Sequence, residues 1–212
     1  MTTIKFPRNI NEFADQLIDN LAAHSYALQP NFLSQEESNA VLKHIQALQD
    51  EDELKKAGIG KQLKFDVREN LRGDFIRWIS KSDEPVIVQS FLQRMDFLMQ
   101  LLNRTCFLSL KDFEAHYTFY PTNTRYIKHR DRFQHNAHRL ISVVCYLASD
   151  WKVADGGQLI IYNEGEAHEI LPAQGTLVCF RSELEHEVLL TNRERYSIKG
   201  WMLDQPAKLT FL

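Results

Sequence analysis

The apolar residues of this chain change their period near residue 106, and this change limits the fold more than any single motif. Before it, apolar residues recur at spacings of three and four, which is typical of helices. After it, they alternate with polar residues or form short runs separated by turn signals: LISVVCYLA, GQLIIYN, EILP, GTLVCF, HEVLL and YSIKGWML. Many short strands at such regular spacing predict an α+β protein, built as a sandwich, barrel or jelly roll with helices covering one outer face.

Three helices are predicted in the first half. The first covers residues of about 9–23. The second opens with Ser34, which is followed three residues later by Glu37 and so forms a capping box. The third follows Pro85 and carries a wide apolar stripe. Between the second and third helices, the stretch GIGKQLKFDVRENLRGDFIRWIS (58–80) predicts a loop or irregular hairpin, suited to a mobile lid.

Length and composition predict one domain in an ordinary globular protein. With 212 residues and 44% hydrophobic side chains the chain can bury a sizeable core. We expect residues 1–212 to form one domain, with 1–105 as mainly helical support and lid and 106–212 as the sheet core. The net charge of −3 gives no global attraction to nucleic acid or to an anionic membrane.

The sequence also predicts a cytoplasmic location. No apolar run approaches the roughly 18 to 20 residues that span a bilayer, and the start MTTIKFPRNINEF lacks the apolar segment of a secretory signal. The three cysteines, Cys106, Cys145 and Cys179, lie in apolar stretches that resemble strands, which favours reduced, buried thiols.

An acid stands among bases in the stretch RYIKHRDRF (125–133). On a strand, successive side chains point to opposite faces. Lys128, Arg130 and Arg132 would then share a solvated face. His129 and Asp131 would share the other, about 7 Å apart along the strand. An imidazole and a carboxylate are two of the three groups of a facial iron site.

A third ligand is available near the end of the chain. His186 begins a short strand, and Arg195 follows after a turn at Thr191-Asn192. In a rolled sheet a late strand can lie beside an early one, so His186 could join His129 and Asp131. Two imidazoles and one carboxylate hold Fe(II) on one face and leave about three positions free. Arg195 offers a planar fork for a carboxylate.

These residues, in this order and spacing, resemble the iron(II)- and 2-oxoglutarate-dependent oxygenases, whose fold is a double-stranded β-helix of the jelly-roll type. Further stretches resemble the prolyl 4-hydroxylase branch, especially the oxygen-sensing prolyl hydroxylases and their bacterial relatives: LRGDFIRWI, YPTNTRYIKHRD, YLASDW, GGQLIIY and ERYSIKGWMLD. The resemblance covers residues of about 60–204. It implies a dioxygenase that hydroxylates a prolyl residue of a protein, releasing succinate and CO2, with Fe(II), 2-oxoglutarate and O2, and with ascorbate as a candidate reductant.

The resemblance also implies roles for single residues. His129, Asp131 and His186 match the iron ligands, and Arg195 matches the cation that binds the distal carboxylate of 2-oxoglutarate. Five more residues match the cosubstrate contacts, a charged pair that ties a substrate-covering loop to the core, and a pocket wall: Tyr146 and Tyr120 (cosubstrate), Asp74 and Arg139 (loop pair), and Trp201 (wall). YPTNTRY is one residue shorter than the family's usual form and lacks its glycines, so the substrate entrance is expected to differ in shape.

Other functions stay open at this point. The same oxygenase chemistry could act on a free amino acid or on a methylated nucleobase, and the basic face of Lys128, Arg130 and Arg132 is the only hint of nucleic acid. The chain could be a non-catalytic jelly-roll binding module. A zinc hydrolase built on His135 and His138 lacks a recognisable zinc motif with a nearby general base.

Overall fold

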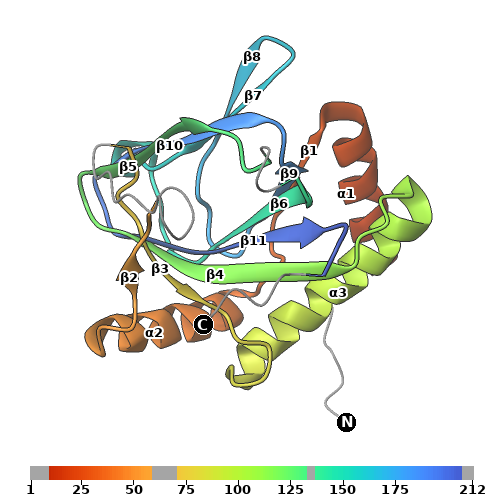
Figure 1. The fold of residues 1–212 in the computed structure, drawn as a ribbon. Coiled ribbons are helices and arrows are strands. Elements are labelled where there is room, and N and C mark those ends of the chain that lie inside the picture. Colours follow the sequence, from red (N-terminus) through yellow and green to blue (C-terminus); the bar gives the residue numbers. More distant parts are fainter. Residues whose placement is uncertain (1–9, 59–70, 133–136, 207–212) are drawn as a thin grey trace.

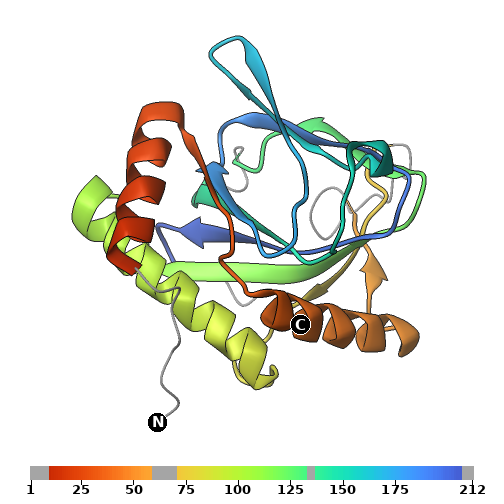
Figure 2. The same ribbon diagram turned by 180° about the vertical axis from the view of Figure 1, so that it is seen from behind.

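The structure is a computed structural model, and it describes residues 10–58, 71–132 and 137–206; for 10–14 it describes the backbone alone. Three helices lie on one side of two stacked antiparallel sheets (Figures 1 and 2). The helices are α1 (Ile10–His24), α2 (Gln35–Asp50) and α3 (Val86–Cys106). They confirm the three predicted helices. Within the described residues, no helix is both long and apolar enough to cross a membrane.

The larger sheet has seven strands in the order β1-β9-β6-β11-β4-β3-β2. Their bounds are β1 (Tyr26–Gln29), β2 (Lys55–Lys56), β3 (Phe75–Trp78), β4 (Asp112–Tyr120), β6 (Arg139–Tyr146), β9 (Leu177–Arg181) and β11 (Arg195–Leu203). The smaller sheet has four strands in the order β5-β10-β7-β8. Their bounds are β5 (Thr124–His129), β7 (Leu159–Asn163), β8 (Glu166–Ile170) and β10 (Glu185–Thr191), and a short 3-10 turn, η3 (Val153–Asp155), precedes β7. This arrangement confirms the predicted jelly roll.

The apolar core lies mainly between the helices and the larger sheet. It unites the buried faces of the helices with alternate residues of β4, β6 and β11, such as Phe113, Val143 and Ile198. A smaller cluster, including Tyr146, Ile161 and Phe180, lies between the two sheets. The predicted capping box is confirmed: Ser34 Oγ accepts a hydrogen bond from the Glu37 amide at 3.1 Å, and Glu37 accepts one from the Ser34 amide at 2.8 Å.

Two details of the sequence-based assignment need changing. The strand β1 was not predicted, because its four residues have a short and mixed pattern, yet it pairs with β9 at the sheet edge. Likewise, β2 and β3 bring the first half of the chain into the larger sheet, and most of the expected lid (59–70) lies outside the described residues. All three cysteines are free. Cys106 ends α3 and is half-buried rather than lying in a strand, whereas Cys145 and Cys179 are buried.

Candidate active site

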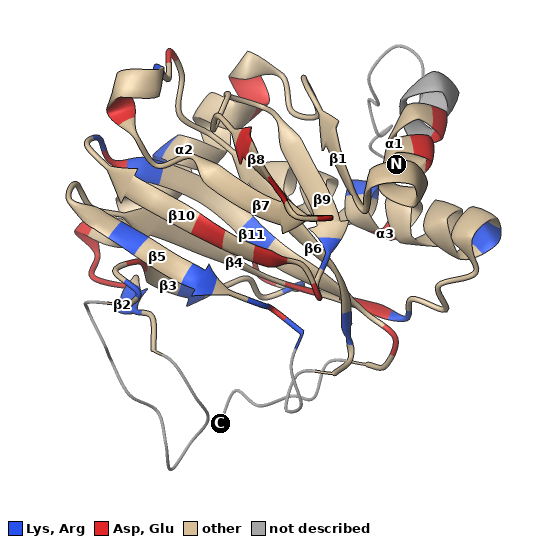
Figure 3. Cartoon of the chain, turned by 90° about the horizontal axis from the view of Figure 1, so that it is seen from above, with Lys and Arg blue, Asp and Glu red and all other residues tan. Residues whose placement is uncertain are grey.

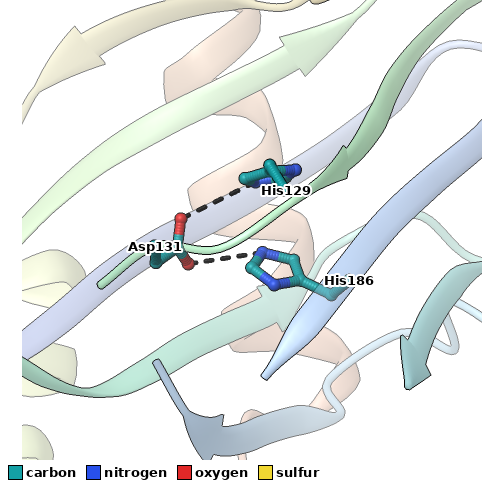
Figure 4. A group of neighbouring side chains, drawn as sticks. All are labelled: His129, Asp131 and His186. Carbon is teal, nitrogen blue, oxygen red and sulfur yellow. Dashed lines mark ion pairs between the residues drawn. The ribbon is translucent and has the colours of Figure 1, made fainter. Parts of the chain in front are cut away.

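Three predicted ligands converge between the two sheets (Figure 4). His129 ends β5 and pairs in register with His186 at the start of β10. Asp131 follows two residues later, where the Arg132 amide donates to the Ser182 carbonyl at 2.8 Å and keeps the chain beside the end of β9. Asp131 lies 3.7 Å from His129 Nε2 and 3.4 Å from His186 Nε2. The ligand atoms of the three residues lie within 4.8 Å of one another.

Hydrogen bonds fix the tautomer and the orientation of both imidazoles. His129 Nδ1 lies 2.7 Å from the Ile127 carbonyl, and His186 Nδ1 lies 3.0 Å from the Leu184 carbonyl. A carbonyl can only accept, so each Nδ1 carries the proton and each Nε2 keeps its lone pair. Among the described residues neither buried Nε2 has a hydrogen-bond partner. Two open imidazole nitrogens beside a buried carboxylate therefore fit ferrous iron.

The electrostatics of the group favour metal binding. Burial, and then the neighbouring His186 and Lys199, lower the pKa of His129 to about 2, so its imidazole is neutral at neutral pH. Burial alone would raise the pKa of Asp131, but Lys199, His186 and His129 together outweigh it, and the pKa lies well below its usual value. Asp131 is therefore a carboxylate. Ser142 Oγ donates to Asp131 Oδ2 at 2.8 Å and fixes its orientation.

Arg195 is the first residue of β11, and it is 2% exposed. Its guanidinium carbon lies 5.2 Å from the centre of the Tyr120 ring and 5.0 Å from that of Tyr146. In the described part of the chain it has no ion pair, and neither Arg195 Nε nor the Tyr146 hydroxyl has a hydrogen-bond partner of good geometry. A buried cation without a carboxylate is costly unless an anion binds to it. Burial raises the pKa of the Tyr146 hydroxyl, so it stays protonated and can donate.

Gly157 makes room for that arginine. Its φ is +66°, in the region that favours glycine, and a Cβ there would lie 3.1 Å from Arg195 Cδ. The chain at Gly156-Gly157 can therefore approach the Arg195 side chain closely.

The predicted pair between Asp74 and Arg139 is wrong. Asp74 is 1% exposed and is bound by Arg72, whose Nε donates to it at 2.6 Å. Arg139 donates to Glu114 at 2.8 Å and lies over the Trp201 ring at 3.5 Å. Each charge thus has a nearer partner than the one predicted. Trp201 is 3% exposed, and its contact with Arg139 holds the ring in place.

Sequence reasoning missed three residues of the site. Lys199 Nζ donates to Asp131 Oδ1 at 3.1 Å, Ser142 binds the other oxygen, and Arg72 holds Asp74. A period-two signal was available for Lys199, because it follows Arg195 by four residues on one face of the strand. Ser142 and Arg72 left no such signal. Of the alternative zinc pair, His135 lies outside the described residues, and His138 is bonded to Asp204 at 2.9 Å.

The fold and the His-Asp-His group define a jelly-roll oxygenase of the kind that uses Fe(II) and 2-oxoglutarate. The profile of the 2OG-Fe(II) oxygenase superfamily matches residues 115–203. Among solved structures, a prolyl-4-hydroxylase of Pseudomonas putida is similar with a TM-score of 0.83 and 36% identity, covering 90% of this chain and 99% of that one. A Trichoplax adhaerens prolyl hydroxylase in complex with a hypoxia inducible factor peptide fragment has a TM-score of 0.83 and 25% identity, covering 91% and 90%.

The mouse prolyl hydroxylase EGLN3 is 28% identical over 196 residues, which cover 82% of this chain and 76% of that protein. The chain therefore belongs to the 2OG-Fe(II) oxygenase superfamily and, within it, to the prolyl hydroxylase-type oxygenases. It is an enzyme whose metal is Fe(II) and whose cosubstrate is 2-oxoglutarate.

Proposed function

We propose that this oxygenase hydroxylates a prolyl residue in a protein substrate and releases succinate and CO2 from 2-oxoglutarate. The observation that carries the proposal is the 36% identity with the Pseudomonas putida prolyl-4-hydroxylase, which this chain matches over nearly its whole length, together with the converging His-Asp-His group. The peptide bound to the Trichoplax relative supports a protein rather than a free amino acid as substrate.

In this proposal His129, Asp131 and His186 hold the iron. When bound, Fe(II) and 2-oxoglutarate supply the oxidation, in which O2 converts the oxo acid to succinate and CO2 while one oxygen atom enters a C–H bond. The protein keeps the three ligands ready: carbonyls fix the two imidazole tautomers, and Ser142 orients the carboxylate. Because the His129 imidazole need lose no proton, this ligand can bind the metal at neutral pH without competition from protons.

Arg195 and Tyr146 are proposed to bind the distal carboxylate of 2-oxoglutarate. Both have donors without partners among the described residues, and both lie between the sheets away from solvent. A bidentate guanidinium and a hydroxyl suit a carboxylate in a dry site. Tyr120, 3% exposed and beside Arg195, is proposed to line the same cosubstrate site.

The remaining predicted residues are proposed to act on the substrate side of the site. Trp201, held by Arg139, is proposed as the wall against which the substrate lies. Asp74, bound by Arg72, is proposed to anchor the chain that leads to the lid. We also propose a cytoplasmic location, which the three free cysteines support.

The test is a search for oxygen added to proline. The enzyme is incubated with Fe(II), 2-oxoglutarate, ascorbate and a cell lysate, and peptides are analysed by mass spectrometry. We expect one protein segment to gain one oxygen on a proline with the wild-type enzyme and not with Arg195→Met. A synthetic peptide of that segment should drive succinate formation, and its Pro→Ala version should not. Oxygen found only on other residues would contradict the prolyl assignment.

A further inference from the structure

A lysine lies next to the proposed iron ligands, in a place where a cation opposes metal binding. Lys199 is on β11 and its side chain is 12% exposed. Its Nζ is 3.1 Å from Asp131 Oδ1, 5.1 Å from the centre of the Trp201 ring and 5.7 Å from that of Tyr126. Two aromatic faces and a carboxylate thus hold the ammonium at the metal end of the site.

The charges of the site call for a further anion. Iron would add two positive charges beside the Lys199 ammonium. Asp131 would be shared between both, and the nearby Asp74 is already paired with Arg72. Like charges a few ångströms apart repel strongly where water is excluded. A lysine at this position therefore weakens metal binding by itself. The repulsion is relieved when an anionic group binds beside both cations.

The second cation of the site lies on the same strand face. Arg195 and Lys199 are four residues apart on β11, which corresponds to about 13 Å along a strand. The terminal carbons of 2-oxoglutarate are joined by four carbon–carbon bonds of about 1.5 Å, so they lie about 5 Å apart when extended. With a hydrogen bond of about 3 Å at each end, the acid spans about 11 Å between cations. This length is comparable to the distance between the two residues.

The two cations also differ in surroundings in the way such a ligand requires. Arg195 lies beside the Tyr120 and Tyr146 rings and is without an acidic partner in the described part of the chain. Lys199 lies against Asp131 itself. A dicarboxylate that extends along β11 would thus have its distal end at Arg195 and its metal-chelating end near Lys199.

We propose that Lys199 is a cosubstrate-binding residue that donates a hydrogen bond to the 1-carboxylate of 2-oxoglutarate, at the end opposite Arg195. This inference rests on the proposed function. The alternative is that Lys199 serves only to orient Asp131. The two roles differ in which affinity Lys199 controls, that for the oxo acid or that for the metal.

The experiment measures both affinities without turnover, under anaerobic conditions. Lys199→Met removes the charge at similar length, and Lys199→Arg keeps it. Lys128→Met is the matched control, because that lysine lies on β5 over the Tyr162 ring, among the outward-facing charges. Fe(II) affinity is measured first. Binding of 2-oxoglutarate to the iron-loaded protein is then followed by the charge-transfer absorption of the chelate. 2-Oxobutyrate, which lacks the distal carboxylate, is titrated in parallel.

We expect Lys199→Met to weaken the binding of both oxo acids by the same factor, about 10-fold or more, since a hydrogen bond to a charged group is lost. Fe(II) affinity should be unchanged or higher. Lys199→Arg should recover part of the oxo acid affinity, and Lys128→Met should behave as wild type. Arg195→Met should weaken the binding of 2-oxoglutarate and leave that of 2-oxobutyrate unchanged.

Unchanged affinity of Lys199→Met for both acids would overturn the inference. Lost Fe(II) affinity in that variant would also overturn it, because Lys199 would then act through Asp131. Failure of the proposed function is a separate result: wild-type protein that binds 2-oxoglutarate but never oxidises proline would leave the Lys199 assignment standing.

Discussion

Two buried carboxylates lie on opposite faces of the seven-stranded sheet, and their surroundings differ in one decisive way. Glu84 and Asp131 are each 5% exposed. Both oxygens of Glu84 accept hydrogen bonds from protein donors: Arg77 and the Ser80 amide bind one, and the Tyr117 hydroxyl binds the other. Both oxygens of Asp131 also accept hydrogen bonds, from Lys199 and Ser142, but Asp131 in addition faces two imidazole nitrogens that have no hydrogen-bond partner among the described residues.

The difference lies in these two imidazole nitrogens, because burial is the same for both carboxylates and both accept hydrogen bonds. A carboxylate surrounded by donors is complete and serves stability. Two imidazole nitrogens with free lone pairs beside a carboxylate are satisfied only when a metal cation lies among them. Adjacent residues of β4 contribute to the two sides of the sheet: Tyr117 points to the helix side, and His116 points to the space between the sheets.

Of the variants considered, Asp131→Ala should have the largest effect, on iron binding between the two sheets. Loss of a ligand should lower Fe(II) affinity by more than the 10- to 100-fold typical of losing a residue that only orients a ligand. Conversion of 2-oxoglutarate to succinate should fall below detection. The measurement is an anaerobic Fe(II) titration together with succinate formation.

The matched control is Ser142→Ala, which removes the hydrogen bonds of this hydroxyl to Asp131 and Ser182 but leaves all three ligands in place. We expect it to weaken Fe(II) binding about 10-fold, within the range for such partners. Equal losses in the two variants would show that Asp131 orients other groups and does not bind the metal.

Glu84→Ala should instead lower the stability of the protein, because Glu84 lies on the helix side of the sheet. It leaves the Tyr117 hydroxyl without its acceptor, and Arg77 keeps only its contact with Glu53 at 2.7 Å. Removing one partner of a buried charge network costs about 3 kcal/mol. The free energy of unfolding in urea should fall by that amount, while Fe(II) affinity of the folded protein stays at the wild-type value. A folded variant that had lost its iron affinity would refute the separation of the two faces.

The sequence was sufficient for the metal ligands and insufficient for the charged partners, and the cause is physical. Period-two alternation alone puts His129 and Asp131 on one face, and a jelly roll brings a late strand beside an early one, which places His186. Ion pairs depend instead on which donor comes nearest in three dimensions. Asp74 is reached by Arg72, two residues away, rather than by the predicted Arg139.

The strand edges show the same limit. The strand β1 is held by register with β9, from Tyr26 opposite Phe180 to Gln29 opposite Leu177, and not by its own propensity. Helices with full apolar stripes and a capping box could be predicted, because those signals lie within one segment.

Acid should destabilise the metal-free protein through the inner face. Burial lowers the pKa of His116 to about 3 and that of His129 to about 2, against an ordinary value of 6.5. In the unfolded chain both take up a proton near pH 6.5, and in the folded protein they do so only several units lower. Their contribution is therefore present above pH 6.5 and is lost as the pH falls, by up to about 1.4 kcal/mol per pH unit for each histidine.

The measurement is urea unfolding from pH 7.5 to 5.0 with a chelator present. His116→Phe removes one of the two titrating groups. We therefore expect the two histidines' contribution to the slope of unfolding free energy against pH to fall by about half. A slope equal to that of wild type would mean that His116 is protonated in the folded state, contrary to its burial among Trp78 and Trp201.

Arg130→Gln should have the smallest effect, because the outer face of the smaller sheet differs from both buried faces. Positive residues on and just after β5 lie beside negative residues on and around β10 (Figure 3). Arg130 lies 3.6 Å from Glu185, and Arg132 lies 3.2 Å from Glu183. Exposed pairs of this kind contribute about 0.2–1 kcal/mol and are screened by salt.

Neither stability nor turnover should change measurably in Arg130→Gln. The same pairing bears on the nucleobase alternative, because cations already matched by glutamates present little net charge to phosphates. Binding of labelled single-stranded DNA at low salt is the sharper test of this face. We expect no binding by wild type; binding that weakened in Arg130→Gln and steeply with salt would make the outer face of β5 a functional surface after all.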